Sequence, residues 1–420
     1  MSGRSLRAAS TRRGSEGGSS AGGVGHALAT TGVRIGSTQP IAARRFASAI
    51  ACAVCACACA DRAFASRAWD CTTSIGSLAC AATNFHYRME RLADGDWEGL
   101  MRQAARDEVD LCKILGFDLI RLYECGTPPE GRPVRIDENT WDFGSYRQEL
   151  LTSGWVRYYT PGVSPASAEQ REIELRRLLA EPYAEPAPPD DRTFTLLREA
   201  RRIIAEEDLD LPIFCACYSM GVATLPTTVL MWFLSERDLL AEMYRRNALN
   251  GLSRGRRLVA EGADIIALGG DLASDHGPMC SPADYRDFIA PGLATQSRAL
   301  HEMGVRTTNA SDGDLWPILN HFLRTAEVDG YEEIDFAAGM DMKRLRTEYP
   351  EKTMIGNVDI RHTLTSGTVE QVREHTIRCI EDGWGNGGHI LMSGNCIHEN
   401  VPTSLFMAHI EAYRDYFGLN

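Results

Sequence analysis

A thiol, an imidazole and a carboxyl group follow one another near the C-terminus, at Cys396, His398 and Glu399 in HILMSGNCIHENVP (389–402). The segment begins with a short apolar run, which is typical of a buried strand. A thiolate and an imidazole can bind a metal ion, although a zinc site takes three or four ligands. An imidazole or a carboxyl group can also transfer protons. The pattern therefore predicts a metal site, an acid–base site or a polar turn, and these alternatives stay open.

Polar residues also follow the other apolar runs of the chain. They are Glu124, Cys125, Cys217, Tyr218, Asp271, Asp275, His276, Asn309, Asp312, Asp314, Asp335, Asn357 and Asp359. Carboxyl groups that lie together at one end of the fold would raise one another's pKa or bind a cation. For each of these acids the structural alternative is helix capping, because Asp and Asn are preferred at helix N-termini.

From this set we predict two kinds of site residue. The predicted acid–base groups are Glu124, Asp271, Asp312 and His398. The predicted substrate-binding residues are Tyr218, His276, Asn357 and Asp359.

The elements that would position these residues alternate between strands and helices from about residue 85 onward. The segment 97–116 has helical spacing and a glycine stop, and 118–126 reads as a strand that ends in polar residues. Ser281 and Pro282 are typical of a helix start. About eight strand candidates, including a weak one at 154–160, predict an α/β fold, a (β/α)8 TIM barrel. A doubly wound open sheet is the alternative.

The chain divides into a tail and one barrel domain. Residues 1–80 are rich in Gly, Ser, Ala and Arg, which predicts a disordered tail or a targeting segment. Residues 81–420 are expected to form the barrel. Within them, 127–192 contains the Pro-rich stretches TPPEGRPVRIDENTW and EPYAEPAPPDD, which predict an irregular insertion near the barrel mouth, acting as a lid.

Charge and composition limit the class of partner. The first 80 residues hold nine Arg and three acids, whereas the whole chain has a net charge of −13. An acidic body argues against a nucleic-acid partner, because phosphate binding needs a basic face. No apolar run of 18 or more residues is present, so we expect no membrane contact. Thirteen scattered cysteines favour a cytoplasmic protein, with organelle targeting by the tail as the alternative.

The order of several motifs resembles the uroporphyrinogen decarboxylase superfamily. The motifs are SPADYRDFIAP, IGNVD and the terminal ILMSGN, within a similarity that covers roughly residues 205–417. This resemblance implies a (β/α)8 barrel, which agrees with the strand count. It also implies one of two activities, because the superfamily includes true decarboxylases and zinc-dependent methyltransferases that serve corrinoid proteins.

The residues that the resemblance assigns to activity differ from both groups. Cys125, with Glu124 beside it, stands where the decarboxylases have an Asp, and Asn395 stands where they have a His. Cys396 falls where the methyltransferases have their second Cys. Their His-x-Cys pair corresponds to Ala310 and Asp312 here, or to Asn309 and Ser311 in the alternative alignment, so one thiolate is missing in either case. The metal ligands that the resemblance implies are Cys396 and Asp312, with His398 or His276 to complete the site.

We therefore expect a cofactor-free carboxy-lyase that acts on a porphyrinogen-type or other carboxylated substrate. The alternatives are a corrinoid-dependent methyltransferase with a zinc site and a non-catalytic ligand-binding barrel. The expected partners are a small-molecule or tetrapyrrole substrate, a corrinoid protein in the methyltransferase alternative, and a second copy of the chain in a homodimer.

Overall fold

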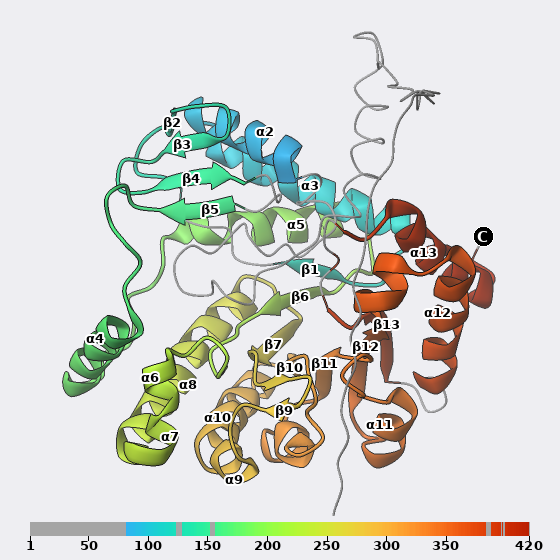
Figure 1. The fold of residues 1–420 in the computed structure, drawn as a ribbon. Helices are drawn as coiled ribbons and strands as arrows, with labels where there is room; N and C mark the ends of the chain where they lie inside the picture. The colour runs from blue at the N-terminus through green and yellow to red at the C-terminus, as the bar shows by residue number, and fades with distance from the viewer. Residues whose placement is uncertain are drawn as a thin grey trace, which may run out of the picture.

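The computed structural model describes residues 81–122, 128–151, 156–383, 388–395, 397 and 400–419. Its main feature is a seven-stranded, all-parallel sheet in the order β1-β6-β7-β10-β11-β12-β13 (Figure 1). The strands are β1 (Ile120–Leu122), β6 (Ile213–Ala216), β7 (Ile265–Gly269), β10 (Arg306–Ala310), β11 (Gly330–Ile334), β12 (Thr353–Val358) and β13 (His389–Ser393). The predicted alternation of strands and helices is confirmed, because helices or helical turns separate the successive strands of this sheet along the chain.

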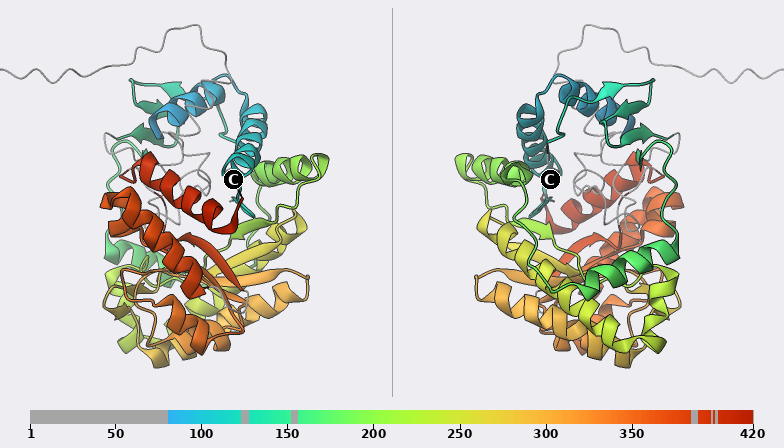
Figure 2. Two further views of the ribbon diagram at one scale, coloured as in Figure 1. Left: turned by 90° about the vertical axis from the view of Figure 1, so that its right-hand side faces the viewer. Right: turned by 90° about the vertical axis from the view of Figure 1, so that its left-hand side faces the viewer.

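Helices connect the strands and cover the outer side of the sheet (Figure 2). Between strands they are α5 (Thr195–Glu206), α6 (Thr227–Leu230), α7 (Trp232–Ser235), α8 (Arg237–Ala260), α9 (Pro282–Asp284), α10 (Ala290–His301), α11 (Met342–Glu348) and α12 (Val369–Gly383). The helices α3 (Trp97–Leu115) and α13 (Thr403–Phe417) precede β1 and follow β13. Short helical turns complete the set: η2 (Asp191–Phe194), η3 (Tyr285–Ile289), η4 (His321–Thr325) and η5 (Ile360–Leu364).

The sheet curls so that its first strand faces its fifth. Arg121 on β1 forms an ion pair with Glu332 on β11, although three strands lie between them in the sheet. The helices that precede β1 and follow β13 also meet, because Leu111 and Leu115 of α3 share a core with Phe406 of α13. The described strands thus form a curled, barrel-like α/β sheet. The described residues contain seven parallel strands in this sheet, and the predicted eight-stranded (β/α)8 barrel stays a prediction.

The weak strand predicted at 154–160 does not belong to this sheet. It contains β5 (Val156–Tyr159), which is an edge of a separate antiparallel sheet with β2 (Val134–Arg135), β3 (Thr140–Asp142) and β4 (Arg147–Leu150). Trp141 and Leu150 of this sheet pack against Phe85 and Met89 of α2 (Ala81–Ala93). The prediction of an irregular insertion was therefore wrong for these residues, because an apolar face lets the short strands bury side chains against α2.

The later part of the insertion is ordered as well. Helix α4 (Ala168–Ala180) begins at Ser167, whose side chain accepts from the Gln170 amide while the Gln170 side chain accepts from the Ser167 amide. This reciprocal capping starts a helix immediately after a Pro-containing stretch. Glu172 of α4 accepts a 3.0 Å hydrogen bond from the Trp232 indole, which attaches the helix to α7.

The local starts of other helices follow their sequence signals. Ser281 accepts a 3.1 Å hydrogen bond from the Asp284 amide, so the predicted cap is confirmed. α3 ends at Gly116, whose φ of 72° is the left-handed conformation that glycine adopts most readily.

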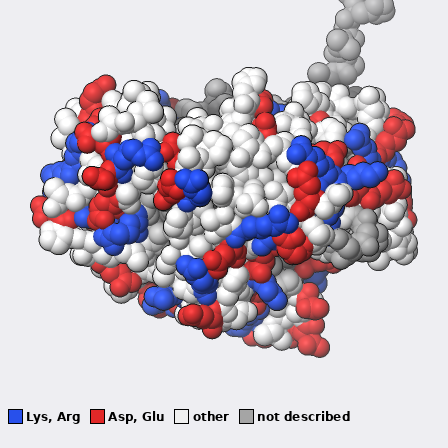
Figure 3. Space-filling view, turned by 90° about the horizontal axis from the view of Figure 1, so that it is seen from below, with Lys and Arg blue, Asp and Glu red and all other residues white. Residues whose placement is uncertain are grey.

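The molecular surface mixes charges of both signs. On the face shown in Figure 3, Lys and Arg side chains lie beside Asp and Glu side chains, without one continuous basic area. Among the described residues, none of the helices is both long and apolar enough to cross a membrane.

Candidate functional site

The carboxyl ends of the parallel strands bring most of the predicted polar residues to one end of the sheet. Tyr218 follows β6, Asp271 follows β7 and Asp312 follows β10. Asp335, Asp359 and Asn395 follow β11, β12 and β13. Sites on curled parallel sheets form at this end because the loops there come from every strand.

Asp312 and Asn395 are in direct contact. The Asn395 amide nitrogen Nδ2 donates to Asp312 Oδ2 at 2.8 Å. Both side chains are half-buried. This bond places the loop after the last strand, which continues into Cys396, against the loop after β10.

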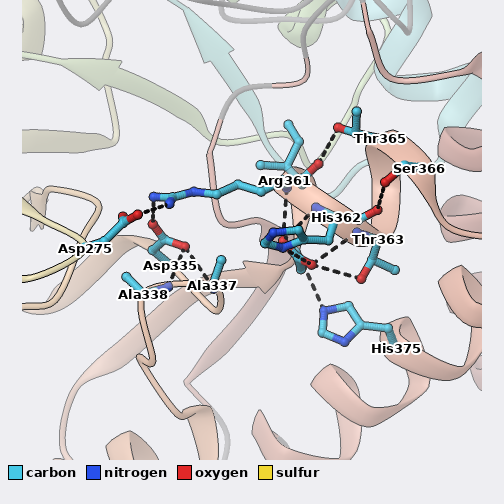
Figure 4. A network of polar contacts seen from close by, with 12 residues as sticks. Asp275, Asp335, Ala337, Ala338, Arg361, His362, Thr363, Thr365, Ser366 and His375 are labelled. Carbon is cyan, nitrogen blue, oxygen red and sulfur yellow. Dashed lines mark hydrogen bonds and ion pairs between the residues drawn. The ribbon is translucent and has the colours of Figure 1, made fainter. Parts of the chain in front are cut away.

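Arg361 connects three loops at the same end (Figure 4). It lies in η5, after β12, and its Nη1 is 2.7 Å from Asp275 Oδ2. Its Nη2 is 2.5 Å from Asp335 Oδ2. Asp275 lies on the turn between β8 (Ala273–Ser274) and β9 (Gly277–Pro278). One guanidinium thus joins the β12 end to the β11 end and to the β8–β9 hairpin.

The surroundings of Asp312 favour its protonated form. Burial raises the pKa of the Asp312 carboxyl above its usual value, and the nearby charge of Asp335 raises it further. The Arg361 charge and the hydrogen bond from Asn395 oppose this rise without cancelling it. A carboxyl group in such surroundings keeps its proton to a higher pH than a free Asp does and is suited to deliver it to a substrate.

A second polar group lies inside the curl of the sheet. Arg121 Nη1 is 2.5 Å from Glu332 Oε1, and its Nη2 also donates to the Tyr218 hydroxyl. Thr308 Oγ1 donates to Glu332 Oε2 at 3.4 Å. The Arg121 guanidinium lies 5.4 Å from the centre of the Phe214 ring. Glu332 is fully buried, and burial raises its pKa even though Arg121 opposes the rise.

The backbone at Glu333 has an unusual conformation. Its φ is 69°, in the left-handed region, and the pairing of β11 with β12 shifts register between Glu332 and Ile334. Residues other than glycine occupy this region rarely, and such positions cluster at functional sites. Burial raises the pKa of Glu333 well above its usual value, and the charges of Glu332, Asp271 and Asp312 act in the same direction. The bulge thus adds a second proton-holding carboxyl close to Asp312.

Asp359 caps the turn that carries Arg361. Its carboxylate accepts from the amides of Arg361 at 3.0 Å, His362 at 3.3 Å and Thr363 at 3.1 Å, and from Thr363 Oγ1 at 3.0 Å. Burial alone would raise the pKa of Asp359, but the hydrogen bonds from Thr363 and His362 outweigh it and lower the pKa. Asp359 is therefore an ionised helix cap.

Comparison with known proteins now identifies the family. The family model described as uroporphyrinogen decarboxylase (URO-D) matches residues 192–416, more than half of the chain. The chain belongs to the uroporphyrinogen decarboxylase family. Among solved structures it resembles a methyltransferase from Methanosarcina mazei at 18% sequence identity and a TM-score of 0.53, over 79% of this chain and 90% of that one. At this identity the likeness shows the fold. A search of curated proteins gave no match.

Within this uroporphyrinogen decarboxylase fold, the predicted residues fall into three groups. Asp271 and Asp312 lie close to Glu333, and Tyr218 lies beside Arg121. His276 is exposed on the β8–β9 hairpin, whereas Asn357 is buried and donates to the Met340 carbonyl at 3.1 Å. Glu124, Cys396 and His398 lie outside the described residues, so their predicted roles stay predictions.

A metal site was predicted at this same end of the sheet in this uroporphyrinogen decarboxylase family member. Within the described ranges, no group of three or more His, Cys, Asp or Glu side chains is arranged to hold a metal ion. Of the predicted pair, Asp312 is described and Cys396 is not. The Asn395–Asp312 contact brings the chain neighbour of Cys396 to Asp312, and the ligand set of a metal at this mouth would have to include residues beyond the described ones.

The site of this family member also contains three residues that we did not predict: Arg361, Glu332 and Glu333. Arg361 follows the IGNVD motif by two residues, and a cation after a strand end could have been included with the acids. Glu332 and Glu333 lie within an expected strand, where the bulge that turns them has no signal in the sequence.

Proposed function

We propose that the protein is a cofactor-free carboxy-lyase that acts on a porphyrinogen-type or other carboxylated substrate in the cytoplasm. The observation that carries this proposal is the grouping of Asp312 with Arg361 and Asp335 at the mouth of the sheet. Decarboxylation needs a cation that holds a substrate carboxylate and an acid that protonates the carbon. Arg361 and Asp312 supply these two groups.

Arg361 is suited to bind a carboxylate. Its guanidinium already pairs with two carboxylates, Asp275 and Asp335, in the geometry that a substrate carboxylate would use. Asp275 is the more exposed of the two, at 51% compared with 9% for the Asp335 side chain. A substrate carboxylate would therefore replace Asp275, while Asp335 holds the guanidinium in place.

Asp312 is suited to complete the reaction. As the carbon–carboxylate bond breaks, CO2 leaves and the electron pair stays on the carbon. The Asp312 carboxyl donates its proton to that carbon and becomes a carboxylate, and a proton from solvent restores it. Glu333, whose pKa burial raises well above its usual value, lies near enough to interact with the Asp312 charge and provides a second proton store. Glu124, Asp271 and His398 are further acid–base candidates, and Tyr218, His276, Asn357 and Asp359 are candidates for substrate contact.

CO2 release from a panel of porphyrinogen carboxylates and simpler carboxylic acids tests this proposal. Asp312→Asn is expected to lower kcat by about 10²–10⁴-fold, the usual contribution of a general acid. Arg361→Gln is expected to raise KM. Glu381→Gln, an exposed acid on α12, is the matched control and should leave both constants unchanged. Binding without CO2 release from any substrate would favour the non-catalytic barrel instead.

Methyl transfer is the second candidate. The hydrogen bond between Asn395 and Asp312 favours it, because it holds the segment that leads to Cys396 against Asp312. The solved structure with a similar fold is that of a methyltransferase. Zinc bound by Cys396 and Asp312 would lower the pKa of a thiol substrate that accepts the methyl group, and the partner would be a corrinoid protein. This reaction needs Asp312 ionised, whereas the lyase reaction needs it protonated.

Metal content separates the two candidates. The full-length protein and Cys396→Ala are purified without chelators and measured by mass spectrometry. About one zinc per chain that is lost in the variant would favour methyl transfer and contradict the lyase proposal. Equal, trace metal content in both proteins would contradict the zinc site.

A further inference from the structure

His375 lies behind the site, on the opposite side of the Asp359 turn from Arg361 (Figure 4). It belongs to α12, and its ring nitrogen Nε2 accepts a 2.9 Å hydrogen bond from the Asp359 amide. The Phe336 ring meets it edge-on, with ring centres 4.6 Å apart. Cys379 Sγ lies 3.6 Å from the same nitrogen. The imidazole is thus fixed between α12, the loop after β11 and the end of β12.

A continuous chain of contacts runs from His375 to the mouth. His375 accepts from the Asp359 amide, and the Asp359 carboxylate accepts from three amides of η5, those of Arg361, His362 and Thr363. From this turn the Arg361 side chain reaches Asp335 and Asp275. Asp335 is itself fixed, because its Oδ1 accepts from the amides of Ala337 at 3.0 Å and Ala338 at 3.2 Å.

We propose that His375 is a positioning residue: its neutral imidazole holds the Asp359 turn and thereby holds Arg361 against Asp335 and Asp275. That Arg361 then contacts the substrate rests on the proposed function. The hydrogen-bond pattern requires Nε2 without a proton, since it accepts from the Asp359 amide and faces the Cys379 thiol. The tautomer with its proton on Nδ1 meets this requirement.

Protonation of His375 would break this arrangement. A second proton on the ring converts Nε2 from an acceptor into a donor, which then opposes the Asp359 amide. Several groups face the ring. Burial lowers the pKa of His375, and the Arg378 charge lowers it too, whereas Asp359 and the Asn357 backbone raise it. Cys379, whose pKa burial raises to about 12, stays a neutral thiol, and His409 of α13 lies near enough to interact by charge. At neutral pH the imidazole is therefore the acceptor that the turn needs.

Two substitutions distinguish the role of His375 as a hydrogen-bond acceptor from the packing of its ring. In His375→Gln the side-chain oxygen can occupy the place of Nε2 and accept from Asp359 without titrating. In His375→Asn the side chain is polar but too short to reach. His409→Asn is the control, because its oxygen can replace His409 Nδ1, which bonds Thr376 at 3.0 Å in the same helix layer.

Hydrogen–deuterium exchange of the full-length protein measures amide protection in the η5 turn and in the β8–β9 hairpin without any substrate. In His375→Asn, we expect amides 359–363 and 273–278 to exchange on the order of tenfold faster, the effect of losing one hydrogen bond. In Arg361→Gln, only 273–278 should accelerate. His375→Gln and His409→Asn should match the wild-type protein in both segments. Unchanged exchange in folded His375→Asn would overturn the proposal.

The pH dependence supplies a readout that loss of packing would not change. After correction for intrinsic exchange rates, wild-type amides 359–363 should lose protection as the pH falls through the lowered pKa of His375. His375→Gln should keep its protection over the same range, and an equal loss in both proteins would contradict the proposal. Succinate binding serves as a separate probe of Arg361. If exchange follows these expectations but succinate affinity is the same in every variant, the positioning role holds and the proposed carboxylate site fails.

Discussion

Arg121 on β1 and Glu332 on β11 meet across the interior of the curled sheet, with 2.5 Å between Nη1 and Oε1. The Glu332 side chain is fully buried and that of Arg121 is 14% exposed. The pair therefore connects opposite walls of the sheet and places two charges beneath the mouth. Tyr218 and Thr308 bond the same two side chains, so the charges are not isolated from polar partners.

Removal of one partner of this pair should destabilise the protein strongly. Arg121→Met or Glu332→Met leaves the other group buried without its oppositely charged neighbour, which typically costs about 3–5 kcal/mol. The double variant Arg121→Met/Glu332→Met should recover most of this loss, because two apolar side chains leave no buried charge. Urea unfolding measured by circular dichroism compares the three variants.

An exposed pair supplies the control for this cycle. Arg344 and Glu348 lie one helical turn apart on α11, 2.7 Å apart and largely exposed. Arg344→Met should change the free energy of unfolding by less than about 1 kcal/mol. Equal losses at Arg344 and Arg121 would show that the interior pair has no special role.

Asp312→Asn should stabilise the protein at neutral pH while it removes activity. Because burial raises the pKa of Asp312 in the folded protein, the ionised form is disfavoured there relative to the unfolded chain. The stability associated with Asp312 is present below the unfolded pKa of about 3.9 and is lost as the pH rises through the folded value. The gain from Asn should therefore grow as the pH rises from about 4 toward the raised pKa of the folded protein, and then stay constant. Thermal unfolding in the presence of a chelator measures it.

The absence of any gain at pH 8 would mean that Asp312 is ionised at no cost in the folded protein. That result would favour its use as a metal ligand, because a metal ligand must be deprotonated. The same titration therefore bears on the choice between the two proposed reactions.

The insertion should behave as a small unit with its own core. Trp141 is 4% exposed and packs with Phe85 and Met89 of α2. Trp141→Ala should remove about 3–5 kcal/mol of local stability. Hydrogen exchange should then accelerate in 134–150 and not in 306–310. Val134→Ala, on the same sheet but 63% exposed, should have little effect, and exchange that rises equally across the chain would contradict a separate core.

Much of the fold could be predicted from local patterns. The parallel strands are short apolar runs followed by polar residues, and Ser281 and Gly116 mark helix ends through backbone preferences that act within a few residues. The segment 154–160 has the same apolar character, but its partner is β4, only a few residues away. Strand composition does not indicate which sheet a strand joins, so the strand at 154–160 was counted with the barrel although it lies in the insertion.

The candidate site was predicted less completely, because its key contacts depend on the direction in which each side chain points from its strand or helix. Asp312 and Asp271 could be found since each follows a strand. Arg121 and Arg306 are both on strands, yet Arg121 faces inward to Glu332 whereas Arg306 lies outside, paired with Asp329. The bulge at Glu333 and the acceptor role of His375 arise only when β11, β12 and α12 are packed together.

A buried histidine on α13 should make the fold sensitive to acid. Burial lowers the pKa of His409 to about 4, and a nearby His375 charge lowers it too. In the unfolded chain the pKa is about 6.5. Stability is therefore full above about pH 6.5 and falls as the pH approaches 4, by about 3 kcal/mol for this residue alone. His375 and His389, whose pKa values burial also lowers, act in the same direction.

Urea unfolding between pH 7.5 and pH 4.5 tests this expectation with His409→Asn, in which the side-chain oxygen can still accept from Thr376. The variant should lose less stability than the wild-type protein as the pH falls, and the difference between the two curves should grow below pH 6.5. Parallel curves would show that His409 is protonated as readily in the folded protein as in the unfolded chain. In that case the acid sensitivity would have to come from other groups, such as the half-buried His375 and His389.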